Sequence, residues 1–164
     1  MSVTDIVLVE SRTMRSQYTD QTDVLDKIGS LTLLPDDTHA TTEMVARFYE
    51  VGVEAVKSLV KDHREELENS GYRVLRGQGY KDFVRSFEDP ATLSLHPKAR
   101  SVALFNRKAI LNVGMLLTES SVAREVRAYL LSGEEMLTEE QKHKAWVRAR
   151  LNGVEARKSF TATL

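Results

Sequence analysis

Side chains near the start of one predicted helix have the chemistry to contact DNA bases. Lys57 can donate hydrogen bonds to O6 and N7 of guanine, and Glu54 can accept one from N4 of cytosine. Val53 can pack against the methyl group of thymine. Ser58 and Lys61 complete the set of residues that this helix would turn toward base edges. We call these residues the base-reading set.

Other nearby side chains suit the DNA backbone. Thr42 and Arg64 flank the base-reading set, and Arg73 and Arg76 follow in a predicted strand. Hydroxyl and guanidinium groups bind phosphate oxygens, which fixes a protein on the duplex without reading its sequence. We therefore expect phosphate contacts from these residues.

The elements that would position these residues fit a helix-turn-helix template over residues 42–60. The template needs a small residue where its two helices cross, and Ala46 supplies it. It also needs an apolar residue just after the turn, which is Val51. Two apolar positions hold the second helix across the first, and Val56 and Leu59 occupy them.

The turn departs from the usual template at one position. A glycine commonly stands immediately before the apolar turn residue, but this chain has Glu50 there. We expect Gly52 to relieve the backbone instead. The second helix is predicted over about 53–69, and its N-terminal residues would enter the major groove.

The charged residues of the second helix have an alternative interpretation as an ordinary solvated face. Acidic side chains gather toward its far end and would repel a phosphate backbone. These residues are Asp62, Glu65, Glu66 and Glu68. The sequence leaves both interpretations open.

A basic segment follows this helix. Residues 72–76 predict a strand, Gly77-Gln78-Gly79 predicts a closing turn, and 80–87 fits a short helix. Residues 71–109 hold 8 Lys and Arg against 3 acidic residues, a net charge of +5. A helix-turn-helix followed by a basic, hairpin-like element is the winged-helix arrangement. The alternative is an ordinary basic loop.

The remaining pattern predicts a mainly α protein with short β strands. Residues 1–20 predict a flexible N-terminal segment with a short strand at 3–9. A helix is expected from about residue 23 to a stop at Gly29, then a strand over 31–34 and a turn at 35–37. We assign 21–88 to a winged-helix-like helix-turn-helix domain.

A second block is predicted after a proline-containing linker at 89–100. It begins with a strand at 102–105 and continues with helices from 107, from 120 or 121, and from 139 to 151. We expect this block, residues 101–152, to serve dimerisation or to dock a protein partner. Residues 153–164 are expected to form a tail.

Composition excludes several classes of function. The 164 residues contain no cysteine, which excludes disulfides, iron–sulfur sites and thiol nucleophiles. No apolar run is long enough to span a bilayer, so we expect a cytoplasmic protein without membrane contact. The four histidines show no metal-ligand spacing, and no nucleotide-binding or nucleophile motif occurs. We therefore expect neither an enzyme nor a cofactor.

The net charge of −1 hides an asymmetry between the two halves of the chain. Residues 1–70 hold 7 Lys and Arg against 14 Asp and Glu, whereas residues 71–164 hold 16 against 10. A protein that grips nucleic acid by charge alone is basic overall. A DNA-binding surface must therefore be built locally.

Two stretches resemble a known group of phage regulators. Residues 31–75 read LTLLPDDTHATTEMVARFYEVGVEAVKSLVKDHREELENSGYRVL, and residues 101–135 read SVALFNRKAILNVGMLLTESSVAREVRAYLLSGEE. In the second stretch Ala123, Val126 and Arg127 match an Ala-x-x-Val/Phe-Arg helix. These stretches are similar to antirepressors of the Bro-N, Rha and KilA-N type and to uncharacterised actinobacterial proteins. The resemblance implies a DNA-binding or repressor-interacting role.

Two functional hypotheses follow. The first is a sequence-specific DNA-binding transcriptional regulator of phage or mobile-element type that binds double-stranded DNA as a homodimer. The alternative is an antirepressor-like protein-interaction module without direct DNA binding. For the dimer, we expect Met115, Leu131 and Trp146 to form an exposed apolar patch. Trp146 could instead fold back onto the 107–117 helix and complete a monomer core.

Overall fold

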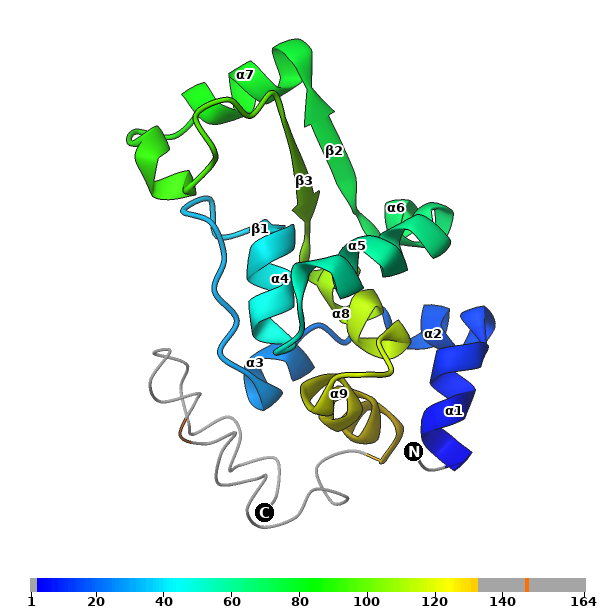
Figure 1. Ribbon diagram of the computed structural model, residues 1–164. Helices are drawn as coiled ribbons and strands as arrows, with labels where there is room; N and C mark the ends of the chain where they lie inside the picture. Colours follow the sequence, from blue (N-terminus) through cyan, green and yellow to red (C-terminus); the bar gives the residue numbers. More distant parts are fainter. Residues whose placement is uncertain (1–2, 133–146, 148–164) are drawn as a thin grey trace.

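The computed structural model describes residues 3–132 and Val147, and it is mainly α-helical with a small antiparallel sheet (Figure 1). This confirms the predicted class of a mainly α protein with short strands. In chain order the elements are α1 (Val3–Glu10), α2 (Arg12–Tyr18), α3 (Val24–Ile28), β1 (Ala40–Thr41), α4 (Thr42–Phe48), α5 (Val53–Asp62), α6 (Arg64–Ser70), β2 (Arg73–Arg76), α7 (Gly77–Arg85), the 3-10 helix η1 (Pro90–Leu93), β3 (Ser101–Phe105), α8 (Arg107–Leu116) and α9 (Ser121–Ser132).

The three strands pair in the order β1-β3-β2. The middle strand, β3, is antiparallel to both neighbours, and its Leu104 lies opposite Thr41 on one side and Arg73 on the other. The β2–β3 ladder extends away from the helical body, and α7 lies at its far end (Figure 1). This ladder is the longer of the two strand pairings.

Each face of the sheet packs against a different apolar cluster. Val74 and Ala103 are paired and pack against the main core, which α4, α5, α8 and α9 help to build. Leu104 belongs to a second cluster, which α7 covers with Phe83 and other apolar side chains. Because successive residues of a strand point to opposite faces, the two clusters sandwich the sheet.

Helix α8 lies inside the main core. All of its residues from Ala109 to Leu116 are buried. Gly114 allows a close approach to the end of α4, because a Cβ there would overlap the hydroxyl group of Tyr49. That hydroxyl donates to the carbonyl oxygen of Ile110 at 2.6 Å. The helix predicted from residue 107 is therefore confirmed, and it is a buried one.

The sequence-based prediction for residues 1–20 is wrong. Instead of a flexible segment with a strand at 3–9, α1 and α2 pack on the body of the protein, and Leu8 is fully buried. The buried guanidinium of Arg15 joins α2 to the carboxylate of Glu66 in α6 through two hydrogen bonds of 2.7 Å. It also donates to the carbonyl oxygen of Val9 at 2.7 Å. These distant partners order a segment whose own pattern is weak.

The division into a domain at 21–88, a linker at 89–100 and a block at 101–152 is also wrong for the described residues. Strand β3 of the supposed second block is the middle strand of the sheet. Leu93 of the supposed linker is buried, and one core cluster contains residues from Leu8 to Leu130. The two parts therefore share one core. The predicted helix at 139–151 and the tail at 153–164 lie outside the described residues.

The apolar patch expected for dimerisation does not form as predicted. Met115 is fully buried, and Leu131 is partly buried against the main core. Both side chains therefore belong to the protomer's own packing. Trp146 lies outside the described residues.

The segment 31–37 combines one wrong and one confirmed prediction. Residues 31–34 form no strand; the backbone N–H of Leu34 donates to the carbonyl of His39 across a turn, at 2.8 Å. The turn at 35–37 is as predicted, because the Asp36 carboxylate accepts from the backbone N–H groups of Thr38 and His39.

Candidate nucleic-acid interface

The two helices of the predicted template, α4 and α5, pack against each other. Ala46 is buried at 2% exposure and Val56 at 0%, and Leu59 is partly buried against the same cluster. The backbone N–H of Val51 donates to the carbonyl of Ala46 at 3.0 Å, which closes the turn onto α4. The packing roles predicted for these residues are therefore confirmed. Helix α4 begins after Thr41, whose hydroxyl accepts from the backbone N–H of Met44 at 3.4 Å.

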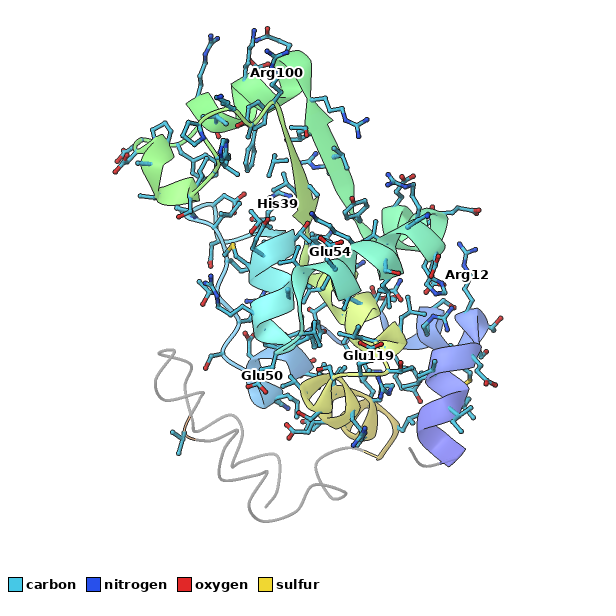
Figure 2. The ribbon with its side chains drawn as sticks, in the orientation of Figure 1. Arg12, His39, Glu50, Glu54, Arg100 and Glu119 are labelled. Atoms are coloured by element: carbon cyan, nitrogen blue, oxygen red, sulfur yellow. The ribbon has the colours of Figure 1, made fainter. Side chains whose placement is uncertain are left out.

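The turn itself is achieved differently from the expectation. Glu50, labelled in Figure 2, has φ of +56°, so it takes the left-handed conformation that the template usually gives to glycine. Gly52 has φ of −70° and caps the start of α5, a conformation open to any residue. Glu50, not Gly52, therefore carries the strain of the turn.

Replacing Glu50 with glycine is expected to stabilise the protein by about 0.5–1 kcal/mol. A left-handed residue other than glycine costs about 1–2 kcal/mol, of which the greater chain entropy of unfolded glycine offsets a part. Gly52→Ala is the matched control and should destabilise slightly, because alanine is the poorer helix N-cap. Urea unfolding midpoints measure both. If both substitutions changed the stability in the same direction, or if Glu50→Gly destabilised the protein and Gly52→Ala stabilised it, the strain would not lie at Glu50.

The exposed face of α5 carries most of the base-reading set. Glu54, Lys57, Ser58 and Lys61 are exposed, while Val53 is partly buried at the start of the helix. The Nζ atom of Lys57 lies 3.6 Å from Oε1 of Glu54. Both side chains are more than half exposed, so this ion pair contributes little to stability and can open readily.

The predicted helix over 53–69 is in fact two helices. The backbone of His63 has φ of −128° and ψ of 32°, which ends α5 at Asp62 and starts α6 at Arg64. Arg64 therefore lies on a separate helix from the base-reading set. Its guanidinium is 3.8 Å from Glu68 and stacks 6.0 Å from the ring of Tyr72.

All three carboxylates of α6 have cationic partners, Glu68 through Arg64. Glu66 accepts both of its short hydrogen bonds from Arg15, and Arg12 lies 3.8 Å from Glu65. Burial raises the pKa of Glu66, but the hydrogen bonds and charge of Arg15 lower it more, so the pKa lies below its ordinary value. These pairs reduce the repulsion that the acidic residues would exert on a nearby phosphate backbone.

The remaining predicted phosphate contacts lie at the two ends of β2 and at the start of α4. Arg73 and Arg76 are both exposed, and Thr42 is partly buried as the first residue of α4. Because Val74 lies on the main-core face, Arg76 lies on that face and Arg73 on the opposite one. The two arginines therefore do not form one phosphate clamp.

Arg73 has a local partner on its own face. Its Nη2 lies 3.5 Å from Nε2 of His39, whose Nδ1 is 2.7 Å from the Asp36 carboxylate. Burial raises the pKa of Asp36, but the hydrogen bonds from His39 and the turn backbone lower it more, and the net shift is downward. His39, labelled in Figure 2, thus joins the turn at 35–37 to the sheet.

Cations of the described chain divide into paired and unpaired groups. Arg107 lies 3.0 Å from Asp26 and Lys108 lies 2.8 Å from Asp20, so both offset the acidic first half of the chain. Both residues are counted in the net charge of +5 for residues 71–109, but their ion pairs mean that they do not add to a basic surface there. By contrast, no carboxylate of the described residues lies within ion-pair distance of the exposed cations at the far end of the β2–β3 ladder and in its connection. These are Arg76, Lys81, Arg85, Lys98 and Arg100.

The connection between β2 and β3 is the part of the site that sequence reasoning assigned least well. Gly77-Gln78-Gly79 does not form the predicted reverse turn between strands. These residues begin helix α7, which continues to Arg85. The apolar spacing of residues 80–87 did indicate a helix. The strand that pairs with β2 was not predictable, because β3 comes after α7 and η1 and does not follow a short turn.

Neither a metal site nor a membrane span is found in the described ranges. Within residues 3–132, no three His, Asp or Glu side chains converge in a way that would hold a metal ion. None of the helices in this part of the chain combines the length and apolar character needed to cross a bilayer. Comparison of the chain with family models, with curated proteins and with solved structures gives no match.

Proposed function

We propose that this protein is a sequence-specific DNA-binding transcriptional regulator of phage or mobile-element type, with α5 as its recognition helix. The observation that carries the proposal is the turn between α4 and α5. Glu50 accepts the left-handed backbone conformation that this turn needs, and the bond from Val51 to Ala46 closes it. The result leaves Glu54, Lys57 and Ser58 exposed on the outer face of α5, as the face of a helix that enters the major groove must be.

The exposed side chains of α5 supply complementary groups for base edges. Lys57 donates to guanine and Glu54 accepts from cytosine once their weak ion pair opens. Val53, at the start of the helix, packs against a thymine methyl group. Ser58 and Lys61 extend the contact along the same helix.

The β2–β3 ladder supports a winged-helix arrangement in an unusual form. It follows α5 and α6 in the chain and projects from the helical body, as a wing does (Figure 1). Arg76, on the face that packs on the main core, is its phosphate contact in this proposal. Thr42 at the start of α4 contacts the phosphate backbone from the other helix.

A single recognition helix reads only a few base pairs, so the regulator acts as a homodimer on two half-sites. The alternative function is an antirepressor-like protein-interaction module. The observation that favours it is the exposure of Glu65 and Glu68 on α6, whose ion pairs are long, at 3.8 Å, so that they weaken phosphate binding nearby. A module of that kind would bind no DNA even at low salt.

The test is selection of duplexes from a random pool by the full chain, followed by affinity measurements on the enriched site. Lys57→Ala should cost about 1–3 kcal/mol on that site and much less on random DNA. Arg124→Ala, an exposed cation on α9, is the matched control and should bind both duplexes as the wild type does. Failure to enrich any site would contradict sequence-specific recognition, and equal losses on both duplexes would limit Lys57 to phosphate contact.

A further inference from the structure

The connection between β2 and β3 is far longer than an antiparallel pair needs. Hairpin loops usually take about two to five residues. Here residues 77–100 form α7, η1 and the segments around them. Part of this length has a packing role, because Tyr80, Phe83 and Phe87 cover the second apolar cluster. This packing explains the side of the connection that faces the second apolar cluster, but it does not explain the exposed side.

The outer side of α7 carries cations that have no ion pair with a carboxylate of the described chain. Lys81 and Arg85 are exposed and stand four residues apart, so they are neighbours on one helix face. Like charges at this spacing destabilise a helix. The connection holds three carboxylates: Asp82 accepts from Gln78, Asp89 caps η1, and Glu88 is exposed after the end of α7. In the described chain, none of the three has an ion pair with a cation of α7.

The same connection returns to the sheet through more cations. Arg100 lies at the far end of the ladder, where the neighbouring residue Ser101 pairs with Arg76 (Figure 2). Lys98 precedes it and is exposed. Helix α7 starts directly after Arg76, and the connection returns beside Arg76 through Arg100, so these cations lie on segments that meet at this end of the ladder. We call Arg76, Lys81, Arg85, Lys98 and Arg100 the basic arm.

We propose that the basic arm binds the phosphate backbone of the same DNA duplex that α5 reads, at the end of the β2–β3 ladder that projects from the helical body (Figure 1). The inference rests on the proposed function and adds a second, sequence-independent contact surface to it. Unpaired cations are suited to bind a polyanion such as DNA. Their binding releases counterions from the phosphates, so the affinity falls steeply as the salt concentration rises. The helical form of the arm presents Lys81 and Arg85 together on one rigid face.

The experiment measures the affinity of the full chain for a random-sequence duplex of about 30 base pairs, from about 50 to 200 mM salt. Lys81→Gln/Arg85→Gln should reduce the slope of log affinity against log salt by about two in magnitude, at about 0.9 for each lost contact. Lys98→Gln/Arg100→Gln tests the returning side in the same way. Lys108→Gln/Arg124→Gln removes the same charge from α8 and α9, which lie away from α7 (Figure 1), and should leave the slope unchanged.

The outcomes separate this inference from the proposed function. If the wild type binds and both arm variants keep its slope, the basic arm is not a contact, while recognition by α5 still stands. If the control loses as much slope as the arm variants, overall charge and not a local contact is responsible, and the inference is overturned. A wild type that binds no duplex at the lowest salt overturns both proposals. Melting temperatures should change little, because all substituted side chains are exposed.

Discussion

Replacement of Arg15 with methionine is expected to lower the free energy of unfolding by about 3–5 kcal/mol. Arg15 is only 4% exposed, and its Nε and Nη2 donate to the two carboxylate oxygens of Glu66 at 2.7 Å each. Its Nη1 also donates to the carbonyls of Leu8 and Val9 at 2.9 and 2.7 Å. Methionine has a similar length but no donor. The variant would leave a nearly buried carboxylate without its partner.

A double variant separates the ion pair from the packing of the arginine. Arg15→Met/Glu66→Leu should recover a large part of the loss, because removing both charges removes the cost of the uncompensated carboxylate. Arg12→Met is the matched control, since Arg12 is half exposed and lies 3.8–4.0 Å from its acidic partners. It should change stability by less than about 0.5 kcal/mol. A single variant as stable as this control would contradict the role assigned to Arg15.

The same pair predicts a reversal in the pH dependence of stability. In the wild type the pKa of Glu66 lies below its ordinary value of 4.5, so its stabilisation is present above that value. It is lost as the pH falls below 4.5 through the folded-state pKa. In Arg15→Met, burial without a partner raises the pKa of Glu66, so stability should increase as the pH falls through that raised pKa toward 4.5. Urea unfolding at several pH values measures both slopes.

Local pattern was sufficient to predict the helices that carry the candidate site. Ala46 and Val56 mark the faces of α4 and α5 that pack together, and both are buried as expected. Helix ends were also predictable where a side chain caps them: Thr41 caps α4 and Ser120 accepts from Ala123 at the start of α9. Such features depend on residues a few positions apart, which a single sequence displays directly.

The parts that were not predictable depend on distant partners. Residues 11–21 have a polar pattern typical of a mobile segment, and only Glu66 in α6 explains why Arg15 is buried there. From the sequence, strand β3 was predicted to start a second block, because its local pattern does not show that it pairs with both β1 and β2. Periodicity identifies the face of an element that will be buried, but it does not identify what that face will pack against.

The conformation of Glu50 illustrates a different limit. The template identified the position that needs a left-handed residue, but residue preference pointed to Gly52 as the one able to adopt it. The contacts of the turn decide otherwise, since the bond from Val51 to Ala46 fixes the backbone on either side of Glu50. Strain accepted at one position of an otherwise well-packed turn is therefore invisible to local preference.

Replacement of Arg127 with methionine should destabilise the protein by about 2–6 kcal/mol. Arg127 is fully buried on α9, and its Nη1 donates to the carbonyls of Gly114 and Leu117 at 3.0 and 2.7 Å. These carbonyls lie at the C-terminal end of α8, where no further helical N–H group can reach them. Leaving a buried acceptor without its donor costs about 1–3 kcal/mol, and this variant leaves two.

The helix dipole adds to this expectation. The C-terminal end of α8 carries partial negative charge, so a buried cation is favourable there and a neutral thioether is not. Arg127→Lys keeps the positive charge but lacks the planar donor fork, and its loss should lie between those of the wild type and the methionine variant. The role of Arg127 in the Ala-x-x-Val-Arg pattern is therefore structural, together with Ala123 and Val126, which are buried beside it.

The measurement compares urea unfolding of Arg127→Met with that of Arg124→Met, one turn earlier on the same helix. Arg124 is exposed, so its replacement should change the free energy of unfolding by no more than about 0.5 kcal/mol. Backbone amide exchange should also accelerate at the end of α8 in Arg127→Met and not in the control. Equal stability of the two variants would show that the carbonyls of Gly114 and Leu117 do not depend on Arg127. A large difference would establish that Arg127 on α9 stabilises the end of the buried helix α8 in addition to the apolar packing between the two helices.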